Sequence, residues 1–110
     1  MSGSGDPDFS TGGGGNSQQD CRSLSGQGTI MSPAPAVLAT LNVNDYLDIK
    51  LRTVTSLQGV TLGGQVVGGV FVNPGSLQSA IIACINDGNE YQGRITSLVG
   101  GLCELFISVK

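Results

Sequence analysis

The stretch Asn73–Gly88, NPGSLQSAIIACINDG, decides the fold, because it shows the beginning, the end and the apolar face of one helix. Asn73 suits a helix N-cap, Pro74 has the backbone angle of a first helical position, and Gly88 suits the left-handed turn that ends a helix. Ile82 widens the apolar face. The main stripe recurs at helical spacing and consists of Leu77, Ala80, Ile81, Cys84 and Ile85. We therefore expect one helix whose apolar face is buried in the core.

Two alternating segments follow this helix and are separated by Gly100-Gly101. Residues 90–98 alternate through Tyr91, Gly93 and Ile95, and residues 102–110 alternate in the same way. The second segment places four apolar residues on one face, namely Cys103, Leu105, Ile107 and Val109. A period of two is typical of strands with one buried face, so we predict a β-hairpin.

Three further strands are predicted before the helix, over residues 46–52, 60–62 and 65–72. Gln58-Gly59 and Gly63-Gly64 are expected to form the turns between them, and a helical turn is expected to begin at Pro35. The doublet Gly68-Gly69 predicts a bulge that lets the sheet curl. The order β-β-β-α-β-β indicates an α+β fold. We expect a small, strongly bent antiparallel sheet or a partly open barrel with one helix.

The chain divides into two parts by composition. Residues 1–20 are rich in glycine and serine and contain no aliphatic residue after Met1, which predicts a disordered tail or linker. A segment that folds on a partner is the alternative. Residues 21–110 form the single predicted domain, and they contain five acidic and five basic residues. Because the basic residues are few and scattered, this part of the chain is a poor candidate for binding long duplex DNA or RNA.

The three cysteines are odd in number and widely spaced, so we expect free thiols and a reducing, cytoplasmic compartment. Cys84 and Cys103 are interpreted as core residues. Cys21 stands between tail and domain, where a reactive or crosslinking thiol is the alternative to an inert one. No signal peptide and no apolar run of eighteen residues is visible, so neither secretion nor membrane insertion is indicated.

Signatures of chemistry are absent from the sequence. It contains no histidine and no C-x-x-C motif, so we expect no catalytic, cofactor-binding or metal-binding residues. Two carboxylate pairs, Asp45 with Asp48 and Asp87 with Glu90, are interpreted as solvated turn residues. The glycine-rich segments lack the lysine and the strand-to-helix context of a phosphate-binding loop. The sequence therefore indicates a protein that is not an enzyme.

One family resemblance covers about thirty-five residues. The run Val67–Val70, the helix Leu77–Ile85, and then Gly88, Tyr91 and Arg94-Ile95 resemble the second half of HIRAN domains. That resemblance implies a small barrel that recognises single-stranded DNA ends through its surface. The charged and asparagine-rich stretch that the family has before its third strand is replaced here by residues 53–64, so no nucleic-acid contact is carried over.

These observations favour a binding or assembly module, bacterial in style, that acts through protein–protein contact or homo-oligomerisation at a sheet edge or the helix. The alternatives are a HIRAN-like single-stranded nucleic-acid binder and a small-ligand sensor that uses the mouth of the barrel. If an aromatic side chain lies beside an arginine on the open face, bases can stack there while the guanidinium holds a phosphate. The candidate binding residues are Tyr46, Arg52, Ile82, Tyr91 and Arg94.

Overall fold

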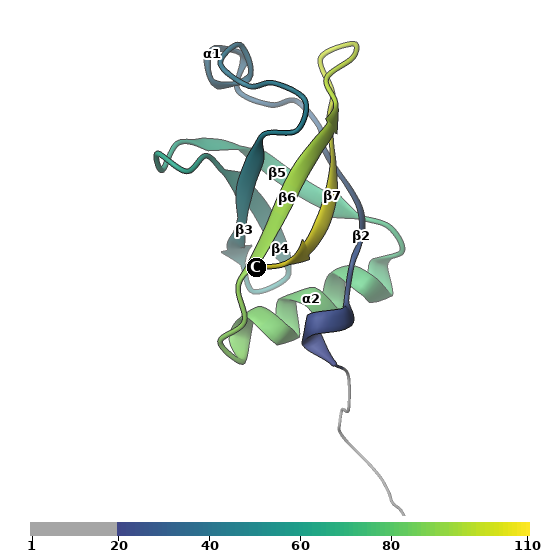
Figure 1. The fold of residues 1–110 in the computed structure, drawn as a ribbon. Helices are drawn as coiled ribbons and strands as arrows, with labels where there is room; N and C mark the ends of the chain where they lie inside the picture. The colour runs from purple at the N-terminus through teal and green to yellow at the C-terminus, as the bar shows by residue number, and fades with distance from the viewer. Residues whose placement is uncertain (1–19) are drawn as a thin grey trace, which may run out of the picture.

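The computed structural model describes residues 20–110, so the predicted tail over residues 1–20 lies outside the described residues except for Asp20. The described part is a barrel of six antiparallel strands with one main helix (Figure 1). Its elements are η1 (Cys21–Ser23), β2 (Gly26–Ile30), α1 (Pro35–Leu38), β3 (Tyr46–Thr53), β4 (Ser56–Val60), β5 (Val66–Val72), α2 (Gly75–Asn86), β6 (Tyr91–Ser97) and β7 (Cys103–Val109).

The barrel is closed, with the strand order β2-β5-β4-β3-β6-β7. Strand β2 closes it by pairing with β5 on one side and with β7 on the other. The sequence does not predict β2, because two of its inward positions are glycines. A Cβ on Gly28 would lie 2.6 Å from Ile107 Cδ1, and one on Gly26 would lie 2.5 Å from Leu77 Cδ2. The expected partly open barrel is therefore a closed one, because a strand without apolar alternation completes it.

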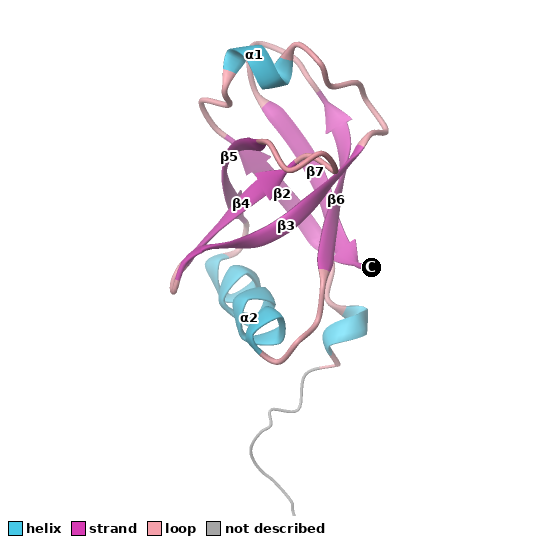
Figure 2. Cartoon of the chain, turned by 90° about the vertical axis from the view of Figure 1, so that its left-hand side faces the viewer, coloured by secondary structure: helices cyan, strands magenta, loops and turns pink. Residues whose placement is uncertain are grey.

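The core fills the inside of the barrel with inward-facing aliphatic side chains from all six strands. Those with no exposed surface include Ile30, Leu47, Leu57, Ile95, Leu105 and Ile107. Helix α2 lies across one end of the barrel, and α1 lies at the other end (Figure 1 and Figure 2). The buried side of α2 is formed by Ala80, Ile81, Ile82 and Cys84. Helix α2 thus seals the end that its apolar face covers.

The predicted helix is confirmed, with one difference at its beginning. Pro74, rather than Asn73, is the N-cap residue, and no side chain caps the helix. Gln78 instead reaches back to β5, where its Oε1 accepts a hydrogen bond of 2.9 Å from the backbone N–H of Val72. At the other end Gly88 has a φ of +100°, as predicted for the residue that ends the helix. The sequence therefore predicts the C-terminal end of the helix more accurately than its N-terminal end.

Most of the strands lie where they are predicted, including β3, β5 and the β6–β7 hairpin, and a helical turn begins at Pro35. The prediction for β4 is wrong. The strand Ser56–Val60 includes Gln58-Gly59, which were predicted to turn. A Cβ on Gly59 would lie 2.9 Å from Ile30 Cδ1, so this glycine permits close packing inside the barrel. The bulge predicted at Gly68-Gly69 lies beside that doublet, because Gly59 pairs with Gly68 and Val60 pairs with Val66, which leaves Val67 as the additional residue of β5.

Candidate binding surface on the barrel exterior

A row of outward-facing side chains crosses β3, β6 and β7. Tyr46 is paired with Arg94, and Arg94 is paired with Phe106. The residues that follow Tyr46 and Arg94 and precede Phe106 are all fully buried, so the row faces outward. Directly opposite residues on paired strands have Cβ atoms about 4.5–5.5 Å apart, which places Arg94 between two aromatic residues. The strands that carry the row lie side by side in Figure 1.

A second row continues the surface across β2. Thr29 is paired with Phe71 on one side and with Glu104 on the other. Phe71 is 61% exposed, compared with 45% for Tyr46 and 37% for Phe106. The two rows adjoin through β7, where Glu104 and Phe106 are two residues apart and face the same way. We call the surface formed by Tyr46, Arg94, Glu104 and Phe106 the outer patch. Phe71 lies further round the closed barrel, on β5, two strands from β7.

The two charged side chains of the outer patch form no salt bridge among residues 20–110. The ion pairs of this part of the chain join Lys110 Nζ to Asp48 Oδ1 at 2.5 Å and to Glu90 Oε1 at 3.8 Å. Arg94 Nη1 donates one hydrogen bond of 3.2 Å to Asn44 Oδ1. The guanidinium therefore keeps donors for a binding partner, and the carboxylate of Glu104 keeps its acceptors.

Two of the five sequence-predicted binding residues are brought together on this surface, namely Tyr46 and Arg94. Two others are buried, and their assignment to a binding surface is corrected. Ile82 is 8% exposed because it packs into the core beneath α2. Tyr91 is 1% exposed, and its hydroxyl donates a hydrogen bond of 2.5 Å to the carbonyl of Cys21. Burial, with a smaller effect from the carboxylate of Asp20, raises the pKa of Tyr91.

The fifth residue, Arg52, is exposed but lies away from the outer patch. It is three outward positions along β3 from Tyr46, or roughly 20 Å at the rise of a strand. Its guanidinium lies over Gly69, where an added Cβ would come within 3.0 Å of Arg52 Nη1. A cation at this distance belongs to a different part of the surface.

Two exposed phenylalanines, Phe106 on the outer patch and Phe71 on β5, are not among the sequence-predicted binding residues, although a signal for their exposure was present. Phe106 stands between Leu105 and Ile107, which the alternation already assigned to the interior. Phe71 stands in the same way between Val70 and Val72, which are both buried. In a strand the neighbours of inward residues face outward, so the same period predicts two exposed aromatic rings.

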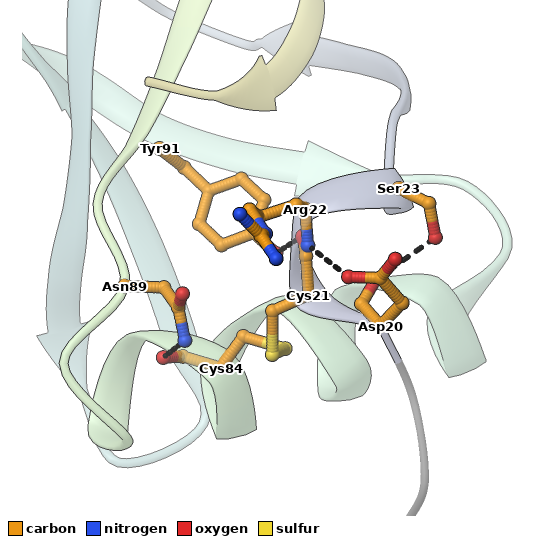
Figure 3. Close-up of a disulfide and its surroundings, with 7 residues drawn as sticks. All are labelled: Asp20, Cys21, Arg22, Ser23, Cys84, Asn89 and Tyr91. Carbon is orange, nitrogen blue, oxygen red and sulfur yellow. Dashed lines mark hydrogen bonds between the residues drawn. A yellow bond between two sulfur atoms is a disulfide. The ribbon is translucent and has the colours of Figure 1, made fainter.

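A disulfide joins Cys21 in η1 to Cys84 in α2, across 63 positions of sequence and a Cα–Cα distance of 5.7 Å (Figure 3). The prediction of free thiols is therefore wrong for these two cysteines. Pairing over this distance depends on the tertiary fold, which brings η1 against the helix. Cys103 is free and buried, as predicted, and its burial raises the pKa of its thiol to about 11.

Hydrogen bonds around the disulfide hold the chain at both of its cysteines (Figure 3). Asp20 Oδ1 accepts a hydrogen bond of 3.0 Å from the N–H of Arg22, and Ser23 Oγ donates one of 2.9 Å to the carbonyl of Asp20. On the helix side Asn89 Nδ2 donates one of 2.9 Å to the carbonyl of Cys84. The segment that enters the barrel is thus held against α2 by both covalent and polar contacts.

A cavity of about 260 Å³ lies between β3, the end of α2 and the start of β6. Its apolar wall includes Ile49 and Ile85, and its charged rim includes Asp48 and Lys110. Asp48 is the main cause of the raised pKa of Lys110, through a side-chain hydrogen bond. Because these two charges already satisfy each other, the cavity presents few free polar groups to a ligand. Its volume is also below the roughly 300–1,000 Å³ usual for small-molecule sites.

The interpretation of Asp45 and Asp48 as solvated turn residues is wrong for Asp48, which is a residue of strand β3. Asp45 Oδ2 accepts a hydrogen bond of 2.9 Å from the N–H of Asn42 and so belongs to the turn before β3, whereas Asp48 binds Lys110. Within the described range, no group of three or more cysteine and carboxylate side chains is arranged to hold a metal ion.

Comparison with protein-family models, with curated proteins and with solved structures finds no match for this chain. Over residues 20–110, no helix has the length and apolar character needed to cross a membrane.

Proposed function

We propose that the protein is a non-enzymatic binding module that attaches to another protein surface through the outer patch. The observation that supports this most is the Tyr46–Arg94–Phe106 row, in which two exposed aromatic rings flank a guanidinium on neighbouring strands. Tyrosine, arginine and phenylalanine are enriched in protein interfaces, and tyrosine and arginine are frequent hot-spot residues. Their side chains combine a large contact area with hydrogen-bonding groups.

The two routes to assembly that the sequence suggested receive no support from the fold. Each strand of the barrel is hydrogen-bonded on both sides, so among residues 20–110 no sheet edge is open for another strand. The apolar side of α2 faces the core, so the helix has no spare apolar stripe. The exterior of the barrel is the surface that remains, and two of the three exposed aromatic residues among residues 20–110, Tyr46 and Phe106, lie on the outer patch.

A matched set of variants tests this function. Tyr46→Ala and Phe106→Ala each remove an aromatic ring of the row, while Leu62→Ala removes an exposed side chain from the β4–β5 turn. We expect both patch variants to bind their protein partner at least about tenfold more weakly than wild type, whether binding is measured as self-association or as quantitative capture of a partner from extracts. The Leu62→Ala control should retain it. If all three proteins associate equally, the outer patch is not the binding surface.

Single-stranded nucleic acid is the second candidate ligand. Bases stack on exposed aromatic rings and a guanidinium can hold a phosphate, which the row of Tyr46, Arg94 and Phe106 would allow. The resemblance to HIRAN domains points the same way. Fluorescence anisotropy with short single-stranded oligonucleotides at low salt separates the two functions. Binding that Tyr46→Ala abolishes would favour nucleic acid, whereas no binding at micromolar protein favours a protein partner.

Catalysis and small-ligand sensing receive less support. The whole sequence lacks histidine, and the two carboxylates that line the cavity, Asp48 and Glu90, both form ion pairs with Lys110. A ligand in the cavity would have to displace the Lys110–Asp48 pair. Isothermal titration with a small-molecule library, in wild type and in Asp48→Asn, would reveal such a ligand as binding that the substitution changes.

The compartment of action forms part of the proposal. The expected cytoplasmic location depended on free thiols, and the Cys21–Cys84 disulfide removes that premise. Disulfides persist in oxidising environments, so we propose that the module works in one. Thiol titration of the denatured protein, prepared from its native source under acid quench, should detect only Cys103. Three titratable thiols would place the protein in a reducing compartment.

A further inference from the structure

The charges of the outer patch suggest what binds there, and this step rests on the proposed function. The patch carries one cation, Arg94, and one anion, Glu104, and neither forms a salt bridge in the described part of the chain. Glu104 lies two residues along β7 from Phe106, the cross-strand partner of Arg94. The two charged residues are thus diagonal neighbours, at a separation of roughly 7–8 Å between positions.

This arrangement is complementary to itself. In a two-fold symmetric contact, every contact occurs twice: if one residue of the first copy contacts a different residue of the second copy, the same two residue types also meet with the copies exchanged. A two-fold axis that brings Arg94 to Glu104 of the second copy also brings Glu104 to Arg94 of that copy. Phe106, which neighbours both residues on the same face, then lies close to the axis and near Phe106 of the second copy.

We propose that the outer patch binds a second copy of this chain in a two-fold dimer held by two reciprocal Arg94–Glu104 contacts around a central pair of Phe106 rings. Tyr46, the cross-strand partner of Arg94 on β3, extends the apolar contact. Protein interfaces usually have aromatic rings at the centre and charged groups around them.

Charge favours a second copy over a partner of one sign. A strongly acidic partner would be attracted by Arg94 but repelled by Glu104. A strongly basic partner would be attracted by Glu104 but repelled by Arg94. The chain has a net charge of −3 that comes from Asp6, Asp8 and Asp20, so residues 21–110, with five acidic and five basic residues, add no net repulsion between two copies. Because the outer surface of a barrel is convex, the contact is small, and we expect a dissociation constant on the order of micromolar.

A charge-reversal pair tests the dimer. Arg94→Glu places a new carboxylate against Glu104 of the second copy at both symmetric contacts, and Glu104→Arg places two arginines together at both. Each variant alone should therefore lose dimerisation by more than about a hundredfold in sedimentation velocity. An equimolar mixture of the two variants should dimerise again, because every reversed charge then faces its opposite. This recovery cannot arise from damage to either fold.

Three outcomes would overturn the dimer. One is a wild type that remains monomeric at millimolar concentration, and another is a mixture that stays monomeric while wild type dimerises. If a charge reversal impairs folding in circular dichroism, Arg94→Gln and Glu104→Gln replace the reversal variants, and each should weaken the dimer about three- to tenfold. Unchanged dimerisation in both of these variants is the third outcome that would overturn the dimer. The proposed function survives these results if Tyr46→Ala and Phe106→Ala still abolish capture of a different protein, and it fails only if they do not.

Discussion

The end of the barrel under α2 and the outer patch use similar apolar side chains in opposite ways. At the helix end Ile81, Ile82 and Tyr91 are buried and tied to the entering chain by the Cys21–Cys84 disulfide. On the outer patch Tyr46 and Phe106 are exposed, and no covalent bond or salt bridge in residues 20–110 holds them. The difference teaches that stability and binding reside in separate regions, so substitutions should affect one property without the other.

The largest expected effect comes from a charge placed beneath α2, compared with the same charge on the exterior of the barrel. Ile82→Glu puts a carboxylate at a buried position without a partner, which costs several kcal/mol and should leave the protein unfolded. Phe71→Glu adds the same group at an exposed position and should change the free energy of unfolding by about 0.5 kcal/mol. Circular dichroism with urea titration measures both. Equal losses of stability in the two variants would erase the distinction between the helix end and the exterior.

The disulfide should give the next largest effect. It closes a loop of 63 positions, and loop entropy predicts about 4 kcal/mol of stabilisation relative to the reduced chain. Urea denaturation with and without reductant measures this difference. The double variant Cys21→Ala/Cys84→Ala is the control, because reductant should no longer shift its midpoint. A wild type that is indifferent to reductant would show that the bond contributes nothing to stability.

Tyr91→Phe compares the two regions through the loss of a single hydroxyl group in each. The substitution keeps the ring in the core and removes the bond from the Tyr91 hydroxyl to the carbonyl of Cys21. We expect a loss of about 0.5–1.5 kcal/mol in urea denaturation. Tyr46→Phe, which deletes a hydroxyl on the outer patch, is the matched control and should leave stability unchanged. A larger loss for Tyr46→Phe contradicts the assignment of the two tyrosines.

Cys103 should give the smallest effect, which is visible only at alkaline pH. Burial raises its thiol pKa from 9.0 to about 11, so the folded state favours the neutral thiol. Its contribution to stability is complete below pH 9 and is lost as the pH rises toward 11. The urea midpoint of Cys103→Ala should therefore fall less steeply across this window than that of wild type. Tyr91, whose pKa is also raised, contributes to the slope in both proteins; identical slopes would contradict the burial of the thiol.

Local periodicity predicted much of the fold. The helix and four of the six strands are visible in the sequence because their buried positions carry aliphatic residues at a period of 3.6 or 2. Strand β2 and the true limits of β4 are not, because Gly26, Gly28 and Gly59 stand where the barrel wall leaves no room for a side chain. A glycine chosen for close packing has the same letter as a glycine in a turn, and only the tertiary fold separates the two.

The candidate site was predicted in part. Tyr46 and Arg94 were named, but their adjacency depends on the register between β3 and β6, which lie far apart in sequence. Tyr91 was misplaced because its residue type suits both a rim and a core, and a hydrogen bond to the carbonyl of Cys21 satisfies it inside. The disulfide could not be deduced, since three cysteines allow three pairings and the spacing favours none.

The Cys21–Cys84 bond also changes what a protease can do to this protein. The bond encloses five consecutive elements, from β2 to β5, together with most of α2, so any single cut within this ring leaves both fragments in one covalent molecule. The exposed turns at Val54-Thr55 and Leu62–Gly64 lie inside the ring. A chain nicked there would migrate as one species until reduced, and its strands would stay beside their neighbours. Cleavage of the loops between β2 and α2 therefore leaves one covalent molecule, whereas the β6–β7 turn at Gly100-Gly101 lies outside the ring.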